Sequence, residues 1–162
     1  GDLLDGTIFP SEIGSQGVRA GDAMKTGAPV SFHNDGSVSP PIPLLNIQSM
    51  VTRRTLSGHV HGLEQAVTLD DALKAHTTHA AYQLRRDHDL GSITAGKLAD
   101  FVELSADPYT VDIKELTNQV KVLGTWSNGK RIDLEAFIDE IKALPPSENR
   151  HLVGHALRKR CC

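Results

Sequence analysis

Three stretches of the chain space their apolar residues three and four positions apart, as one face of an amphipathic helix does. The first is Leu44–Thr55, which follows a proline-rich stretch and is predicted to end at Gly58. The second is Thr68–Leu84, predicted as one helix that begins with threonine, a good N-cap residue. The third begins at Leu134, and Pro145-Pro146 is predicted to end it.

Shorter apolar runs predict strands at Pro29–His33, Phe101–Leu104, Val120–Trp126 and Lys130–Ile132. An Asn-Gly pair separates the last two runs and is a strong signal for a two-residue hairpin turn. Asn34-Asp35-Gly36 predicts a turn at the C-terminal end of the first run. Together the helices and strands predict an α/β chain.

Length and charge exclude several classes of protein. With 162 residues the chain is too short for a complete eightfold β/α barrel, which needs roughly 200 residues or more. Its net charge of −3 matches nucleic acid poorly, and we interpret Arg158-Lys159-Arg160 as a solvated tail. No apolar run approaches the ~20 residues of a membrane span. We therefore expect no nucleic acid and no membrane among the partners.

The cysteines, Cys161 and Cys162, are adjacent at the end of the chain. Neighbouring cysteines rarely bridge each other, and these two lack the spacing of a Cys-x-x-Cys metal site. Nothing in the sequence predicts a disulfide-built secreted domain, so we expect a cytoplasmic protein. The first residues, Gly1–Gly6, lack an initiator methionine and read like the middle of a protein. We therefore expect that processing or a fragment boundary precedes them.

Three stretches, in this order along the chain, resemble the C-terminal end of the amidohydrolase superfamily. The closest branch is the group of metal-dependent hydrolases that includes N-substituted formamide deformylase. The resemblance covers residues 20–132, with looser similarity before them. The stretches that carry it are Gly27-Ala28-Pro29-Val30-Ser31-Phe32-His33-Asn34-Asp35 with Val38-Ser39-Pro40-Pro41, then Thr68-Leu69-Asp70-Asp71-Ala72-Leu73 running into Thr77-Thr78-His79-Ala80-Ala81-Tyr82, and Gly91-Ser92-Ile93-Thr94-Ala95-Gly96-Lys97-Leu98-Ala99-Asp100-Phe101-Val102.

The resemblance implies a C-terminal part of a metal-dependent hydrolase, with the last strand and outer helices of a β/α barrel plus strands of a small composite β-sandwich. Residues 1–90 are then the terminal barrel segment, and Pro29–His33 is the eighth barrel strand. Residues 91–133 are the sandwich strands, and residues 134–162 are a C-terminal helix and tail. This helix and tail differ from the usual C-terminal end of the family.

The resemblance also implies the chemistry. The family hydrolyses carbon–nitrogen bonds of small, non-peptide amide-type molecules with a divalent metal, in this branch zinc, that activates water. Asp35 matches the aspartate at the mouth of the eighth strand, which touches the metal and shuttles a proton. A carboxylate at the C-terminal end of a barrel strand can indeed serve as ligand and base. Asp35 is therefore the expected catalytic residue and metal ligand.

The remaining metal ligands of the family precede, in family terms, the first residue of this chain, whereas a catalytic zinc has three protein ligands plus water. The chain alone is therefore expected to be inactive. The alternative is a catalytically inactive truncated module that folds or functions by association with a partner chain. In either case, strands that leave unpaired edges favour a homo-oligomer or a missing N-terminal portion.

Several histidines imitate metal ligands. His59-Val60-His61 has the spacing of a His-x-His pair, but it follows a helix and Ser57-Gly58 and aligns with a surface connection in the family, so we interpret it as structural. His33 shares the side of Asp35 by period two and is interpreted as a pocket-wall residue. We interpret the remaining candidates as buried or half-exposed histidines rather than ligands, although the eight histidines together give some chance of local metal affinity: His76, His79 and His88.

The stretch from Gly91 to Lys97 is close to a phosphate-binding loop, with four residues between its glycines and a lysine after the second. The next residue is Leu98, where that motif needs Ser or Thr, and a strand follows instead of a helix. We therefore predict a turn that enters the sandwich. In family terms Asp100 is a structural residue that ties this turn.

Overall fold

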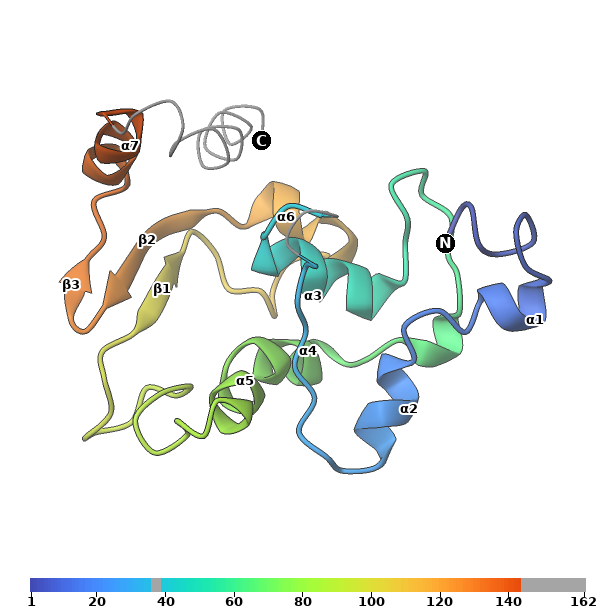
Figure 1. The fold of residues 1–162 in the computed structure, drawn as a ribbon, viewed down its shortest axis with the longest axis horizontal. Helices are drawn as coiled ribbons and strands as arrows, with labels where there is room; N and C mark the ends of the chain where they lie inside the picture. Colours follow the sequence, from blue (N-terminus) through green and yellow to red (C-terminus); the bar gives the residue numbers. More distant parts are fainter. Residues whose placement is uncertain (36–38, 144–162) are drawn as a thin grey trace.

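The structure is a computed structural model that describes residues 1–35 and 39–143 (Figure 1). Up to residue 90 its elements are helical, in the order α1 Ser11–Gly14, α2 Ala20–Lys25, α3 Pro43–Thr52, the 3-10 helix η1 Leu63–Gln65, α4 Leu69–His76 and α5 Thr78–Gln83. The later elements are β1 Phe101–Leu104, the 3-10 helix η2 Ile113–Glu115, α6 Leu116–Gln119, β2 Val122–Ser127, β3 Lys130–Arg131 and α7 Leu134–Ala143. This mixture of helices with a small antiparallel sheet is compatible with the expected α/β fragment.

The hydrophobic core lies where α3 meets α4 on one side and η2 with α6 on the other (Figure 1). The side chain of Gln48 joins α3 to α6, because its Oε1 accepts hydrogen bonds of 2.9 Å from both the backbone nitrogen and the hydroxyl of Thr117. Its Nε2 donates to the Lys114 carbonyl at 2.8 Å. The buried core residues around this junction are Ala20, Ile47, Val67, Ala72, Leu116 and Val120.

Helix α3 ends earlier than the sequence predicts. The expected helix ran to residue 55 and Gly58, but Arg53 adopts a left-handed conformation with φ of 53° and ends the helix after Thr52. Three hydrogen bonds compensate for this unfavourable backbone. The Arg53 guanidinium donates to the carbonyls of Gly17 at 2.7 Å, His61 at 3.1 Å and Val18 at 3.3 Å. Arg53 therefore fastens the end of α3 to two loops.

The predicted single helix Thr68–Leu84 is wrong, because the chain breaks it into α4 and α5 at Thr77. Its start is confirmed, since the Thr68 side chain accepts a hydrogen bond of 3.1 Å from the Asp71 backbone nitrogen. At the break, Thr77 has φ −127° and ψ −94°, and its hydroxyl donates to the Leu73 carbonyl at 2.8 Å. Such side-chain bonding to the preceding turn competes with regular helix geometry.

The predicted strand Pro29–His33 is extended, but it pairs with no strand among the described residues. Side chains of α5 bond its backbone instead. The Val30 backbone nitrogen lies 3.4 Å from His79 Nδ1, and Gln83 Nε2 donates to the Pro29 carbonyl at 3.2 Å. A parallel strand needs neighbours on both sides, and the described residues supply none here.

The three strands form one antiparallel sheet in the order β1-β2-β3. Phe101 pairs with Trp126, their rings stack 4.8 Å apart, and the register shifts between Glu103 and Leu104. The predicted hairpin turn is confirmed, because Asn128 and the glycine after it both have the positive φ that such a turn requires. The predicted strands 120–126 and 130–132 are observed slightly shifted, as β2 and β3.

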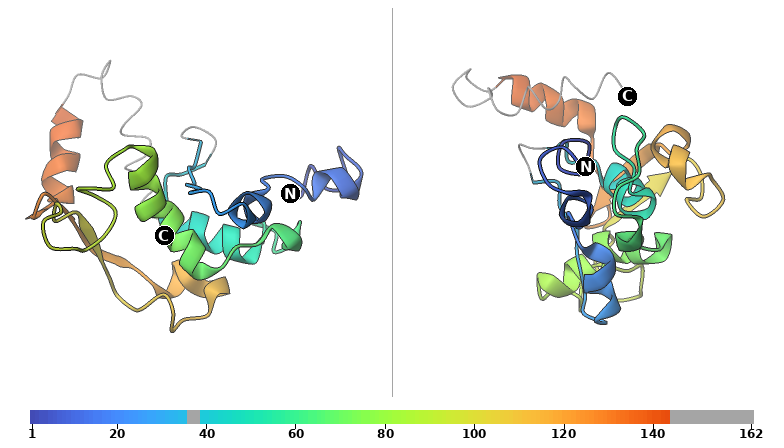
Figure 2. Two further views of the ribbon diagram at one scale, coloured as in Figure 1. Left: turned by 90° about the horizontal axis from the view of Figure 1, so that it is seen from below. Right: turned by 90° about the vertical axis from the view of Figure 1, so that its right-hand side faces the viewer.

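The N-terminal segment with α1 lies at one end of the molecule and the sheet with α7 at the other (Figures 1 and 2). Helix α7 begins at Leu134 as predicted. The predicted helix end at Pro145-Pro146, the Arg158-Lys159-Arg160 cluster and Cys161-Cys162 lie outside the described residues. Among the described helices, none has both the length and the apolar character needed to cross a membrane.

Candidate functional site

A tight hairpin after α3 presents two histidines on one side. Arg54 and Val60 form an antiparallel bridge, and the His61 backbone nitrogen donates to the Arg53 carbonyl at 3.0 Å. Residues two apart in an extended segment point to the same side. The rings of His59 and His61 accordingly lie side by side, with centroids 6.3 Å apart.

Two aspartates of the N-terminal segment meet these histidines. The His61 ring lies between them, with Nδ1 2.6 Å from Asp5 Oδ2 and Nε2 3.3 Å from Asp2 Oδ1. His59 Nδ1 is also 3.3 Å from Asp2 Oδ1. We call Asp2, Asp5, His59 and His61 the His/Asp cluster. Three of its members, Asp2, His59 and His61, each have a possible metal-ligand atom, and these atoms lie within 4.8 Å of one another. No other such group of three is found within the described ranges.

Hydrogen bonds hold both carboxylates of the cluster in their ionised form. The Ser57 hydroxyl donates to Asp2 at 2.7 Å and contributes most to lowering the pKa of this carboxyl to about 2. Thr55 and the two histidines lower this pKa further, whereas partial burial opposes them. The pKa of Asp5 is lowered mainly by the Ser11 hydroxyl and then by His61. Near neutral pH two negatively charged carboxylates therefore flank the imidazole of His61.

The cluster has a shielded floor and an open rim. The side chains of Asp5 and His61 are only 14% and 16% exposed, whereas His59 is 74% exposed. Sequence reasoning considered the His-x-His pair but missed both aspartates, because no spacing connects residues 56 positions apart, as Asp5 and His61 are. The interpretation of the pair as merely structural remains untested.

Asp35, the expected catalytic residue, lies apart from the His/Asp cluster. It is exposed in a turn with φ of 53°, and its backbone nitrogen donates to His33 Nδ1 at 3.0 Å. The preceding Asn34 exchanges two amide hydrogen bonds with Asn46, at 2.8 and 3.0 Å, which fasten the turn to α3. Asn34 is thereby fastened to α3, and the next residue, Asp35, is exposed.

The carboxylate of Asp35 does not make a catalytic zinc site by itself, because such a site takes three protein ligands plus water. Among residues 1–35 and 39–143, the ligand group identified is the His/Asp cluster, and Asp35 is not part of it. Within the described residues, Asp35 therefore lacks the further ligands that its expected role needs.

The other histidine candidates, all within the described residues, are bonded or packed separately. His79 Nδ1 lies 3.2 Å from the Val30 carbonyl, and His88 lies at the surface beside Asp89. The ring of His76 meets Phe32 edge-on at 5.9 Å, and burial lowers the pKa of this histidine. No group of three possible ligands within the described part of the chain includes any of these histidines.

The loop that resembles a phosphate-binding motif forms a turn, as predicted. Lys97 Nζ donates to the Leu90 carbonyl at 3.0 Å and to the Asp87 carbonyl at 2.5 Å. Its ammonium group is therefore already hydrogen-bonded to two backbone oxygens. Asp100 Oδ1 accepts a hydrogen bond of 2.6 Å from the Asn128 backbone nitrogen. Asp100 thus ties this turn to the hairpin between β2 and β3.

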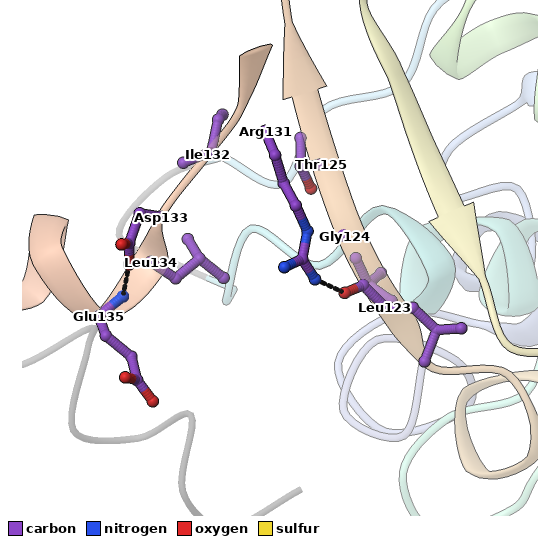
Figure 3. A pocket seen from close by; sticks show the side chains of 9 residues that line it. Leu123, Gly124, Thr125, Arg131, Ile132, Asp133, Leu134 and Glu135 are labelled. Carbon is purple, nitrogen blue, oxygen red and sulfur yellow. Dashed lines mark hydrogen bonds between the residues drawn. The ribbon is translucent and has the colours of Figure 1, made fainter.

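A groove open to solvent lies between β2, β3 and the start of α7 (Figure 3). Arg131 crosses it and donates to the Leu123 carbonyl at 2.8 Å, while the Asp133 carboxylate accepts from the Glu135 backbone nitrogen at 3.0 Å. Neither Asp35 nor any member of the His/Asp cluster lines this groove. The titratable groups of interest therefore lie outside this groove.

Comparison with known proteins identifies related sequences over most of the chain. Residues 1–133 match the model of the amidohydrolase family. N-substituted formamide deformylase of Arthrobacter pascens is 32% identical over 106 residues, which are 65% of this chain and 19% of that protein. Protein LONG AFTER FAR-RED 3 of Arabidopsis thaliana is 34% identical over 110 residues, 67% of this chain and 18% of that protein. The chain thus spans less than a fifth of these relatives, and no solved structure matches it.

Proposed function

Because the chain belongs to the amidohydrolase family, we propose that the full-length protein hydrolyses a carbon–nitrogen bond in a small amide-type molecule. The observation that carries this proposal is the family match over residues 1–133. The name of N-substituted formamide deformylase supports a non-peptide amide as the substrate class. The proposal concerns the whole protein, of which this chain is one portion.

We propose that Asp35 is the catalytic carboxylate that this portion contributes. Its exposure, and the amide pair that fastens the neighbouring Asn34 to α3, support a role that needs an accessible and fixed carboxylate. Asp35 accepts the proton of the attacking water and returns it to the leaving nitrogen, as a general base and then a general acid. A divalent metal, zinc by family resemblance, supplies water activation and carbonyl polarisation when bound. Asp35 is one of its ligands.

We further propose that residues 1–90 close a β/α barrel and that residues 91–133 add strands to a composite β-sandwich. The extended conformation of Pro29–His33, which pairs with no strand among the described residues, supports the first assignment. The exposed strand residues Phe101 and Val102 support the second. Residues 134–162 form a helix and tail beyond both.

One observation favours a second function, that of an inactive module that works by association. Large apolar side chains are exposed in the N-terminal segment and in the sheet with α7, among them Leu3, Ile8, Ile13, Val122, Leu123, Leu134 and Phe137. Burying a side chain of this size is worth about 1.5–3 kcal/mol. A partner chain or a second copy that covers them therefore gains considerable free energy.

Hydrolysis assays separate the two functions. The purified chain is assayed for release of amine from an N-substituted formamide, with and without added Zn²⁺, alone and mixed with the preceding portion of the full-length protein. Zinc-dependent turnover only in the mixture supports the enzymatic proposal. It also supports the expectation that the other metal ligands belong to the preceding portion. Turnover by neither sample, together with tight association of the two portions, supports the inactive module.

A further inference from the structure

The imidazole of His61 is flanked by a carboxylate on each side. Asp5 Oδ2 lies 2.6 Å from Nδ1, and Asp2 Oδ1 lies 3.3 Å from Nε2. The Asp5 contact is short enough to assign the Nδ1 proton to this hydrogen bond. The lone pair of Nε2 then faces the negatively charged Asp2 carboxylate, which is favourable only with a cation between them.

This is the arrangement of a metal-bound histidine with its supporting carboxylate. A histidine that binds a metal usually donates its other ring N–H to a carboxylate or carbonyl, which fixes the tautomer and the ring orientation. Here Asp5 has that supporting position, and the Ser11 hydroxyl donates to its second oxygen at 2.5 Å. The hydroxyls of Thr55 and Ser57 in turn hold the Asp2 carboxylate, at 2.9 and 2.7 Å.

The distances from the Asp2 ligand oxygen to the two histidine nitrogens suit a tetrahedral ion. Zinc with ligand distances of about 2.0–2.1 Å keeps its ligand atoms about 3.3–3.4 Å apart in a tetrahedron. Asp2 Oδ1 is 3.3 Å from both His59 Nδ1 and His61 Nε2. Two imidazoles and one carboxylate favour zinc or a similar transition metal over calcium and magnesium, which prefer oxygen ligands.

We propose that Asp2, His59 and His61 bind a Zn²⁺ ion, with Asp5 as the supporting carboxylate and water in the fourth position. The exposed side of His59 leaves this position open to solvent. The site is separate from Asp35 and goes beyond the proposed hydrolase function. Its ligands come from the N-terminal segment and from the hairpin after α3, so the ion links two parts of the chain that lack a shared helix or strand.

Zinc titration of the full 162-residue chain by calorimetry tests the proposal. We expect the unmodified chain to bind one Zn²⁺ at the site and His59→Ala to lose this binding. His59 is exposed, so we expect the variant to keep its fold, which circular dichroism checks. Asp5→Asn is expected to weaken zinc binding by about 10–100-fold, as loss of a supporting group does. His88→Gln is the matched control, because His88 is equally exposed but lies outside the cluster.

Asp35→Asn separates this site from the proposed hydrolase. We expect it to leave the zinc stoichiometry and affinity of the chain unchanged, even where it abolishes hydrolysis by the full-length protein. Zinc binding that is equally strong in His59→Ala and in the unmodified chain overturns the proposal. So does a chain that binds no zinc at micromolar concentration.

Discussion

Single polar residues hold the segments that surround the His/Asp cluster. Arg53 ends α3 in a left-handed conformation and donates to three carbonyls. Gln65 is 2% exposed, and its side-chain amide fastens η1 to α2. The Asp22 backbone nitrogen donates to Gln65 Oε1 at 3.0 Å, and Gln65 Nε2 donates to Asp22 Oδ2 at 2.9 Å. These side-chain contacts connect segments that are far apart in sequence and do not pair as strands.

Two substitutions at Arg53 separate its backbone strain from its hydrogen bonds. Arg53→Ala removes the guanidinium and keeps a side chain that disfavours the left-handed conformation. We expect it to lower the free energy of unfolding by about 2–4 kcal/mol, because hydrogen bonds to charged groups are worth about 1.5–3 kcal/mol each and do not add fully. Arg53→Gly relieves the strain and is expected to cost about 1 kcal/mol less. Urea denaturation at one protein concentration measures both, and equal losses contradict the strain argument.

Asp22 gives a pH-dependent contribution to stability. The Arg19 guanidinium donates to Asp22 and, with Gln65 and Lys25, lowers the pKa of this carboxyl from 3.8 to about 2. The folded-state pKa is below the unfolded one, so the stabilisation is present above about pH 4 and is lost as the pH falls toward 2. The stability difference between the unmodified chain and Asp22→Asn is expected to shrink over this interval. Asp87→Asn controls for net charge, and a difference independent of pH contradicts the pKa shift.

At the scale of elements, local signals predicted the longest helices and the sheet, and tertiary contacts decided several exceptions. Thr68 and the Asn-Gly turn act through their own neighbours, so their effects could be predicted from sequence. The segment Pro29–His33 has a strand pattern, but a strand exists only by pairing, and α5 bonds its backbone instead. The His/Asp cluster escaped prediction for the same reason, because its aspartates and histidines meet only through the fold.

The start of α4 offers a test of this local control. Thr68→Ala removes the side-chain acceptor of the Asp71 backbone nitrogen and is expected to lower the free energy of unfolding by about 1 kcal/mol. Thr68→Ser keeps the hydroxyl and is expected to retain most of this stability. Thermal and urea unfolding of the three chains measure the difference. A Ser variant as unstable as the Ala variant argues against the cap as the cause.

The whole molecule has a small core and a large exposed apolar surface. Fully buried large side chains among the described residues are Leu116 and Val120, whereas Leu56 and Ile93 are 100% and 90% exposed. A net stability of only about 5–15 kcal/mol is typical of a domain, and exposed apolar area of this extent favours association. The length of the relatives agrees with this view, since the chain covers less than a fifth of them.

Sedimentation of the purified chain tests association. We expect oligomers at micromolar concentration, or a stable complex when the preceding portion of the protein is added, because either covers the exposed apolar residues. Leu116→Ala serves as a control for the core, with an expected loss of about 2–5 kcal/mol in stability and no direct effect on the surface. A compact monomer that melts cooperatively in both the presence and the absence of partner contradicts the prediction.

The turnover of the full-length protein with Asp35→Asn is the most direct measurement of the proposed hydrolase. Asparagine keeps the size of the side chain but cannot accept the proton of water, so kcat for amide hydrolysis is expected to fall by about 10²–10⁴-fold. Asp87→Asn, an equal change of charge at another exposed aspartate, is expected to keep full activity. Asp35→Asn with unchanged kcat and zinc dependence would contradict the assignment of Asp35 as the catalytic carboxylate.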